Sequence, residues 1–369
     1  MEPDKRIEEI DSEIRRLFEE RLEMTKLADE GLTTSEIALR CRKYEREQLG
    51  NAGDFDRVLL ATIFNLSRSY KLTGYGTAGS PLVDEIRRAI AETPKTFPTT
   101  ALVACQGVEG AYSQIAADKL FAGADIRFFK NFEGVFKAVE DGVAQYGVLP
   151  IENSTYGSVI AVYDLMRVHK FHIVRSIRLK INHRLMAKNS VALEDIREVF
   201  SHEQALGQCS EFLKNNPQIK VTIVANTAMA ARMVADSSRT DVAAISSPDC
   251  AALYGLNIVK DDIMNSDHNY TRFICISKNM EIFPGASKIS MMMALGHTPG
   301  SLSDTLVKFS SLGLNLTKIE SRPIAGRDFE FMFYLDIDCS IYSEDVLTLI
   351  GHLDSEPTEF TFLGSYLEV

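Results

Sequence analysis

Apolar side chains recur three and four positions apart near the start of the chain, at Ile7, Ile10, Ile14 and Leu17. This spacing puts them on one side of a helix, which Gly31 is expected to end. A capping box at Thr33 and Glu36 predicts a second helix, and residues 54–70 supply a third. A first helix of roughly 40 Å cannot bury its apolar side within so small a segment, so an intertwined dimer is expected.

The pattern changes twice further along the chain. Residues 73–100 carry Gly and Pro at both ends of a short amphipathic helix, which is typical of a linker. From Ala101, β-branched runs alternate with helical segments and predict an α/β sheet. The alternating strand at residues 177–181 interrupts this order and is expected to cross between two lobes. From Lys288 the order is βαββαβ, the ferredoxin-like arrangement.

These patterns predict a multidomain chain. It has an all-α helical arm, a linker, an α/β domain and a ferredoxin-like module. The predicted bounds are 1–72, 73–100, 101–283 and 288–369.

Composition narrows the class of protein. The 369 residues carry a net charge of -11, which argues against nucleic acid as a partner. Apolar runs fall short of the roughly 20 residues that a membrane span needs, and the first residues lack the layout of an export signal, so we expect a cytoplasmic protein. The six cysteines lie far apart without C-x-x-C spacing, which predicts reduced thiols and neither a zinc site nor disulfides.

One charged residue interrupts the apolar side of the first helix. Arg21 occupies a position where Ile or Leu belongs, and a buried charge needs a partner. Together with four side chains of the next two helices it is predicted to line an anion pocket: Arg46, Glu47, Ser67 and Lys71. On spacing alone, an Arg21 that reaches the dimer surface or pairs with Glu47 structurally is an equal alternative.

Four junctions between a strand and a helix carry small or hydroxyl residues. Singly, such positions are most often plain caps or turns. Several helix starts aimed at one cleft, however, would bind the carboxylates of a small molecule through free N–H groups. The residues predicted to line this cleft are Ser113, Glu152, Asn153, Ser154, Ser201, His202, Gln204, Ala205, Thr227 and Ala228.

Two other kinds of chemistry find little support. The segment Gly107–Ser113 is not the G-x-G-x-x-G fingerprint, so a nicotinamide cofactor is not expected. His202 follows a strand, but a Ser or Cys in a nucleophile-elbow context is lacking, which argues against a hydrolase.

Four motifs occur together in one order: PIENS (150–154), SHEQALGQC (201–209), Thr271-Arg272-Phe273 and LNLTKIESRP (314–323). With them the chain resembles the bacterial bifunctional P-protein family, in which a chorismate mutase is joined to a prephenate dehydratase. The resemblance covers essentially the whole chain and is nearly continuous over residues 101–369. The helical arm resembles the all-helical mutases more loosely.

The resemblance implies that prephenate loses CO2 and its ring hydroxyl to give phenylpyruvate, without a cofactor. It points to Thr271 as the key polar group, and we expect its hydroxyl to stabilise the leaving oxygen while Glu152 or a water supplies the proton. Phe273 would pack near the ring, and Arg272 would bind a carboxylate or brace the loop. Such dehydratases have two α/β lobes similar to periplasmic binding proteins, and closure of the lobes would exclude water.

The C-terminal module resembles an ACT regulatory domain. In that family, phenylalanine binds between two subunits and inhibits the enzyme. The residues that the resemblance carries over to the effector site are Gly300, Ser301, Leu302, Asn315, Glu320, Ser321, Arg322 and Pro323. The arm and this module both predict a homo-oligomer, a dimer or a tetramer.

The mutase-like arm departs from its family pattern. A family arginine is Asp4 here, a lysine is Leu32 and a glutamine is Lys71. Because chorismate is a dianion, the loss of two cations predicts a mutase activity that is weak or absent, and the arm is then a dimerisation or docking unit. Two alternatives to the main reading stay open: a dehydratase that uses arogenate, and an amino-acid sensor that does not catalyse a reaction.

Overall fold

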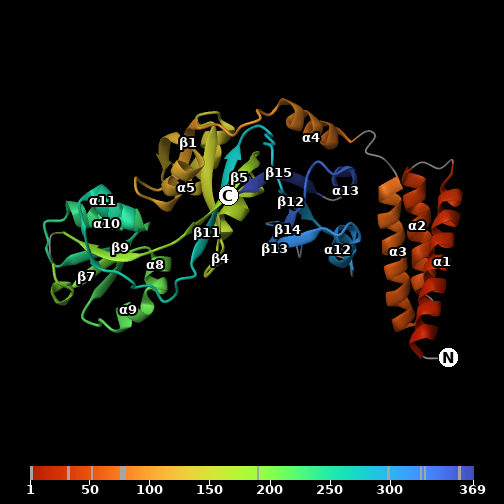
Figure 1. Cartoon of the computed structure of the whole chain (residues 1–369), viewed down its shortest axis with the longest axis horizontal. Helices are drawn as coiled ribbons and strands as arrows, with labels where there is room; N and C mark the ends of the chain where they lie inside the picture. Colours follow the sequence, from red (N-terminus) through yellow and green to blue (C-terminus); the bar gives the residue numbers. More distant parts are fainter. Residues whose placement is uncertain are drawn as a thin grey trace.

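The computed structural model describes residues 3–30, 34–50, 53–74, 80–188, 191–296, 300–324, 326–327, 330–355 and 359–369. The chain runs from a bundle of three helices through two α/β lobes to a C-terminal module that lies between the bundle and the first lobe (Figure 1). Among the described residues, none of the helices is long and apolar enough to cross a membrane.

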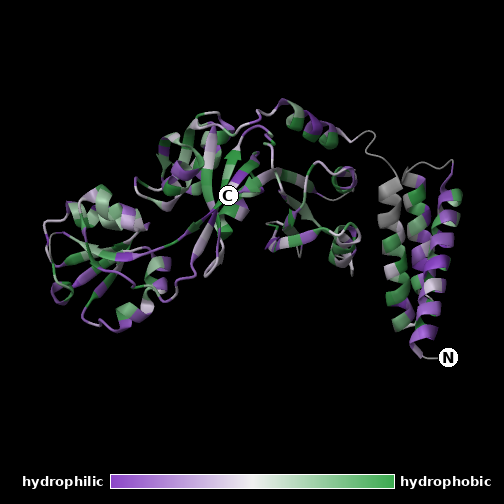
Figure 2. Cartoon of the chain, in the orientation of Figure 1, coloured by the Kyte–Doolittle hydropathy of each residue, from purple (hydrophilic) through white to green (hydrophobic). Residues whose placement is uncertain are grey.

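The helical arm consists of α1 (Pro3–Asp29), α2 (Thr34–Gly50) and α3 (Asp54–Gly74). The three predicted helices are confirmed, while Gly31 and Thr33 lie outside the described residues. Hydrophilic residues dominate α1, and α3 carries more of the apolar ones (Figure 2). The four apolar residues of the predicted seam are exposed in the single chain: Ile7, Ile10, Ile14 and Leu17.

The segment predicted as a linker contains the helix α4 (Pro81–Glu92). Its start is set by Ser80, whose hydroxyl accepts a hydrogen bond from the N–H of Val83. One side of α4 is buried in the same apolar core as the C-terminal module, through Val83, Ile86 and Ala89. Residues 81–92 are therefore a structural part of that module.

The first lobe is built from nine elements. They are β1 (Thr100–Gln106), α5 (Tyr112–Leu120), β2 (Gly123–Phe129), α6 (Phe132–Glu140), β3 (Tyr146–Asn153), β4 (Gly157–Ser158), α7 (Ile160–Met166), β5 (His172–Lys180) and the returning strand β11 (Tyr270–Ser277).

The chain crosses to the second lobe directly after β5, as predicted, and returns over residues 261–269. The backbone N–H of Ile181 donates to the carbonyl of Asn269, so the two crossings lie side by side. The second lobe has a five-stranded sheet in the order β10-β6-β9-β7-β8. Its elements are β6 (Arg184–Ala187), the 3₁₀ turn η1 (Leu193–Asp195), β7 (Glu198–Ser201), α8 (Glu203–Gln208), α9 (Ser210–Lys214), β8 (Lys220–Ile223), α10 (Thr227–Asp236), β9 (Val242–Ser246), α11 (Pro248–Tyr254) and β10 (Asn257–Lys260).

The C-terminal module has the predicted βαββαβ order. It comprises β12 (Lys288–Ala294), α12 (Ser301–Ser311), β13 (Asn315–Pro323), β14 (Phe331–Asp338), α13 (Glu344–Ser355) and β15 (Phe360–Glu368). The strands pair antiparallel in the order β13-β14-β12-β15, so the ferredoxin-like topology is confirmed.

The module and the first lobe share one sheet. The end of β15 pairs in parallel with β5, which gives the order β13-β14-β12-β15-β5-β11-β3-β1-β2, with β4 beside β3. One face of the module packs with α4, α12 and α13, while the other joins a core that includes α6 and α7 of the first lobe. The central strand β12 is buried along its whole length. The module is thus covered on both faces within one chain.

Candidate active site

Two of the predicted site residues lie opposite each other where β3 ends and β11 begins. Asn153 is the register partner of Thr271, and each side chain is buried. A bulge brings them to the same side, because β3 carries one extra residue, Ile151, between the partners of Arg272 and Phe273. With strict alternation, Asn153 would face the other side of the sheet. The bulge therefore creates the pairing of Asn153 with Thr271.

Hydrogen bonds fix the orientation of the Asn153 amide. Its Oδ1 accepts from the backbone N–H groups of Thr155 (3.0 Å) and Tyr156 (2.9 Å). Its Nδ2 donates to Oδ1 of Asn269 (2.7 Å) and to Oγ1 of Thr271 (3.0 Å). A hydroxyl has a single proton, and that of Thr271 is not engaged by any hydrogen bond found among the described residues. This proton is therefore available to a ligand.

Asn269 is a candidate site residue that the sequence motifs did not indicate. It is only 1% exposed, and its Nδ2 lacks a partner within the described part of the chain. A buried amide without its hydrogen bond costs about 1–3 kcal/mol, which is unusual outside functional sites. The signal in the sequence was its position two residues before Thr271, since residues i and i+2 of an extended segment share a face.

Ser154 ties the end of β3 to the returning crossing. Its Oγ accepts from the backbone N–H of Tyr270 (2.9 Å) and lies 3.3 Å from the carbonyl oxygen of His268. The backbone N–H of Ser154 also donates to the carbonyl of Tyr270 (2.8 Å). Ser154 thus joins the site to the hinge between the lobes.

Two helix starts from different lobes meet beside this hinge. A Cβ on Gly110, which has φ of +87°, would lie 2.9 Å from Sγ of Cys250 and 3.7 Å from Cβ of Ala228. The start of α5, with buried Ser113, therefore adjoins the start of α10. Asn226 caps α10, since its Oδ1 accepts from the N–H of Met229 (2.7 Å). The earlier N–H groups of α10, at Thr227 and Ala228, remain for a ligand.

Residues 201–205 of the second lobe were also predicted to line the cleft, and their side chains differ in what they contact. His202 caps α8 and accepts from the N–H of Gln204 (3.3 Å), and burial lowers its pKa. Ser201 is fully buried and donates to the carbonyl of Ile245 (2.6 Å), while Ala205 belongs to the core. Gln204 is exposed. The side chains of Ser201 and Ala205 are thus engaged within the lobe, while those of His202 and Gln204 are not fully buried.

The loop after β3 reaches across to α8. A Cβ on Gly207 would lie 2.0 Å from the hydroxyl oxygen of Tyr156, so that glycine permits the contact between the lobes. This contact and the hinge bonds of Ser154 bring the Asn153 loop of the first lobe and the end of α8 in the second to one junction.

Three predicted catalytic residues do not join this junction. Glu152 faces the C-terminal module and pairs with Nζ of Lys318 (2.8 Å). Arg272 is 6% exposed and points to the same module, because it follows Thr271 on a strand whose side chains alternate. Phe273 is enclosed in the apolar core that covers the α5 side of the sheet. These positions do not support the predicted roles of Glu152 as proton donor and of Phe273 as ring contact. Arg272 takes a bracing position, which was the alternative to its predicted role as a carboxylate ligand.

A buried histidine stands at the first crossing between the lobes. The Tyr112 hydroxyl donates to the carbonyl of Asn182 (2.6 Å) and accepts from its N–H (3.0 Å). The next residue, His183, lies edge-on to the Tyr112 ring, and its Nε2 is 3.0 Å from Oε1 of Gln208. Burial lowers the pKa of His183 to about 4, so its imidazole is neutral near pH 7.

The predicted effector residues are spread along the C-terminal module. Gly300, Ser301 and Leu302 stand at the start of α12, and Asn315 opens β13. Further along β13, Glu320 accepts from the hydroxyl of Ser158 (2.6 Å), and Arg322 lies 3.1 Å from Asp164 of α7. Ser321 and Pro323 alternate with them on the exposed side of the strand.

The arm brings together only part of its predicted pocket. Arg21 donates to the hydroxyl of Ser67 and lies over the Phe64 ring at 5.2 Å, whereas Arg46 and Glu47 are exposed on α2. Lys71 belongs to α3, but its side chain lies outside the described residues.

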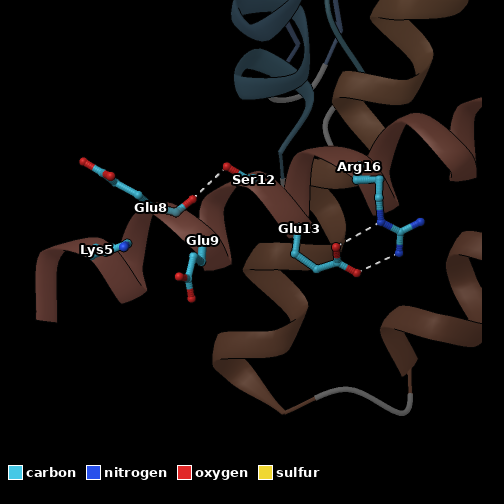
Figure 3. A pocket seen from close by; sticks show the side chains of 6 residues that line it. All are labelled: Lys5, Glu8, Glu9, Ser12, Glu13 and Arg16. Atoms are coloured by element: carbon cyan, nitrogen blue, oxygen red, sulfur yellow. Dashed lines mark hydrogen bonds and ion pairs between the residues drawn. The ribbon is translucent and has the colours of Figure 1, made fainter. Parts of the chain in front are cut away.

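A hollow beside α1 is lined by that helix alone. Its lining residues include Lys5 and Ser12, and its charged side chains pair along the helix, as between Glu13 and Arg16 (Figure 3). All of these side chains come from one exposed helix face, so the hollow is not a candidate active site. Within the described residues, no group of His, Cys, Asp and Glu side chains has the arrangement of a metal site.

Comparisons with known proteins match this part of the chain. The family model "Prephenate dehydratase" covers residues 103–281. The chain is 38% identical to arogenate dehydratase/prephenate dehydratase 2 of Arabidopsis thaliana, over 72% of each chain. It is 33% identical to the bifunctional chorismate mutase/prephenate dehydratase of Escherichia coli K12, over 74% of this chain and 72% of that one.

A solved structure agrees over a similar share. The prephenate dehydratase of Arthrobacter aurescens in complex with L-Phe superimposes with a TM-score of 0.64 at 30% identity, over 72% of this chain and 89% of that one. The family model ends before the C-terminal module and begins after the arm, so its match concerns the two lobes.

Proposed function

The chain belongs to the prephenate dehydratase family, and we propose that it converts prephenate to phenylpyruvate, CO2 and water. The observation that carries this proposal is the Asn153 amide, held by two backbone N–H groups so that it donates to Thr271. An oriented hydroxyl with a free proton at the junction of two lobes suits the departure of a hydroxyl group.

The reaction needs few protein groups. The bond between the ring and its carboxylate breaks, and the electron pair enters the ring as CO2 leaves. The bond between the ring and its hydroxyl breaks, and that oxygen takes one proton and departs as water. The ring becomes aromatic, which supplies the driving force. Thr271 donates a hydrogen bond to the departing oxygen and stays neutral. Glu152 is held by Lys318 on the other side of the sheet, so the proton comes from solvent, and a water that donates it leaves as hydroxide to the bulk.

The two carboxylates of prephenate are bound by backbone N–H groups. The starts of α5 and α10 adjoin each other, and each offers free N–H groups and a partial positive charge. This suits a chain with a net charge of -11, because a dianion is then bound without a cluster of cations.

The test is turnover by the full chain. Wild type supplied with prephenate should form phenylpyruvate, and Thr271→Ala should lower kcat by about 10²–10⁴-fold. Thr348→Val is the matched control, since its hydroxyl donates to the carbonyl of Glu344 one turn earlier in α13, a helix without a candidate active-site residue. A wild type that binds prephenate without turnover would support the alternative of a sensor. Unchanged turnover by Thr271→Ala would remove Thr271 from the mechanism.

Arogenate is the second candidate substrate, because the Arabidopsis relative is named for both activities. It carries an amine where prephenate has a ketone, and the same loss of CO2 and water gives phenylalanine. The ratio of kcat/KM for the two compounds decides between them, and we expect prephenate to be preferred.

We further propose that phenylalanine inhibits the enzyme through the C-terminal module, as an ACT domain. The ferredoxin-like topology and the relative solved with L-Phe support this. The effector would lie at a subunit interface near Gly300–Leu302 and Asn315. Equilibrium binding of phenylalanine to wild type, and its effect on turnover, test the proposal.

For the arm we propose a role in forming a dimer or tetramer, with weak or absent chorismate mutase activity. The exposed seam on α1 supports association. The replacement of two family cations by Asp4 and Leu32 supports the weak or absent mutase activity. Consumption of chorismate by the full chain measures the activity directly. The six cysteines are free thiols, which supports a reducing compartment such as the cytoplasm.

A further inference from the structure

Adjacent residues on β3 and β11 face opposite sides of the shared sheet. Asn153 and Thr271, here the site pair, face the junction of the lobes. Glu152 and Arg272, here the coupling pair, are also register partners, and both face the C-terminal module. Each member of the site pair is therefore one peptide bond away from a member of the coupling pair.

Arg272 is held by two strands of the module. Its Nη1 donates to Oδ2 of Asp336 on β14 (2.5 Å), and its Nη2 donates to the hydroxyl of Tyr366 on β15 (2.6 Å). Its Nε lies 2.9 Å from Oε2 of Glu368. Ser290 of β12 donates to the same Asp336. Within the described part of the chain, Nε of Arg272 makes no hydrogen bond, so Glu368 contributes an ion pair alone. A guanidinium that is 6% exposed and donates from both terminal nitrogens has a fixed position relative to the module.

Glu152 is held by a third strand of the module. Nζ of Lys318 on β13 lies 2.8 Å from Oε1 of Glu152 and donates to Ser158 (2.8 Å). Ser158 in turn donates to Glu320, two residues further along β13 (2.6 Å). The coupling pair thus contacts β13, β14 and β15, and β13 also contains the proposed effector residues 320–323.

We propose that Glu152 and Arg272 are positioning residues, which make the geometry of Asn153 and Thr271 depend on the placement of the C-terminal module. This inference rests on the proposed dehydratase function and its inhibition by phenylalanine. A shift of β13 or β14 relative to the first lobe cannot leave Arg272 and Glu152 in place, because both are bonded to those strands. The movement passes through one peptide bond on each strand to the hydrogen bond between Asn153 and Thr271.

The contacts with the module also explain how the charged side chains of Arg272 and Glu152 can lie on this covered side of the sheet. Arg272 and Glu152 would be costly to bury on this side of the sheet without partners, and the module supplies a carboxylate for one and an ammonium for the other. The partners come from the module and not from the first lobe, so the contact exists only when the module is docked.

The experiment compares three full-length variants. Arg272→Lys keeps the charge and removes the three-way contact. Tyr366→Phe removes one hydroxyl from the same cluster with little change in volume. The matched control is Arg178→Lys, whose exposed side chain also pairs with Glu368 (2.8 Å) but lies on β5. For each variant we would measure kcat and KM for prephenate, the phenylalanine concentration that halves turnover, and the Kd of phenylalanine for the free enzyme.

Arg272→Lys should lower kcat by about tenfold with KM within about twofold, and raise the half-inhibiting phenylalanine concentration by at least about fivefold. Its phenylalanine Kd should stay within about twofold, which a merely unfolded module would not allow. Tyr366→Phe should keep kcat within about twofold and still weaken inhibition, and Arg178→Lys should change neither.

Normal inhibition of both cluster variants would overturn the inference and leave the dehydratase function standing. A wild type that turns over prephenate but ignores phenylalanine would overturn the inference as well. A wild type without turnover would instead remove the proposed function, and the inference with it.

Discussion

In both the helical arm and the two-lobed domain, polar side chains lie among apolar ones. The two regions differ in how far a single chain encloses these polar side chains. In the arm, Arg21 has Ser67 and the Phe64 ring beside it, while Arg46 and Glu47 are exposed. In the lobes, Asn153 and Thr271 are each 9% exposed and bond to one another.

The apolar residues of the two regions show the same contrast. Ile10 and Ile14 of α1 are 44% and 60% exposed, whereas Val103 and Phe273 of the first lobe are enclosed. A single chain therefore encloses the candidate site residues Asn153 and Thr271, whereas it leaves the apolar side of α1 exposed. We therefore expect substitutions in the lobes to change catalysis directly, and substitutions in the arm to change the association of chains.

The largest effect is expected for the residue that orients the hydroxyl. Asn153→Ala removes the donor to Thr271, and we expect kcat to fall by about 10²–10³-fold, the range for a lost hydrogen-bond donor in a catalytic site. Asn216→Ala is the control, because the Asn216 amide donates to the carbonyl of Phe212 and accepts from Gln218, and neither belongs to the candidate site. Steady-state kinetics on both variants check this, and a kcat for Asn153→Ala near that of wild type would contradict it.

The next effect concerns stability and pH. Burial lowers the pKa of His183 to about 4 from its usual 6.5. An unfolded chain therefore takes up the proton first as the pH falls from 6.5 to 4. The stabilisation is complete above pH 6.5 and is lost across this window, by about 3 kcal/mol in total.

Denaturant unfolding at several pH values measures this contribution. His183→Gln should flatten the dependence between pH 6.5 and 4, and the same substitution at the exposed His268 should not. Parallel curves for wild type and His183→Gln would show that the imidazole does not stay neutral when folded.

A smaller loss is expected at Asn269. Its Oδ1 takes one proton of the Asn153 amide, and its own Nδ2 is unpartnered among the described residues. Asn269→Ala should lower kcat by about fivefold, because one hydrogen bond of the network, worth about 1 kcal/mol, is lost. A kcat equal to that of wild type would place Asn269 outside the site.

The smallest effect on dehydration is expected in the arm. Ile14→Asp places a charge on the exposed seam of α1 and should shift the protein toward smaller assemblies in sedimentation velocity. The dehydratase kcat should stay within about twofold. A collapse of kcat would show that the arm completes the site after all.

Sequence patterns predicted the modules well, because each module depends on apolar residues that recur at a regular spacing. The seam of α1, the alternating strand that crosses the hinge and the βαββαβ order all appear where expected. The motif residues Asn153 and Thr271 are also brought together.

Three features of the structure could not be predicted from the spacing of apolar residues along the sequence. The extra residue Ile151 reverses the alternation of β3, so the directions of Glu152 and Asn153 depend on a bulge. Arg272 follows Thr271 and had to face away from it, but its partners on β14 and β15 come from a sheet that two domains share. The helix α4 lies in a Gly- and Pro-rich segment whose packing partner begins nearly 200 residues later.

The central claim is that Asn153 and Thr271 act on the substrate as one unit. A double-mutant cycle tests it, with kcat measured for Asn153→Ala, Thr271→Ala and the double variant on prephenate. We predict that kcat of the double variant is about as low as that of Thr271→Ala alone, because the Asn153 amide affects the substrate only by orienting the Thr271 hydroxyl. Losses that multiply in the double variant would contradict it.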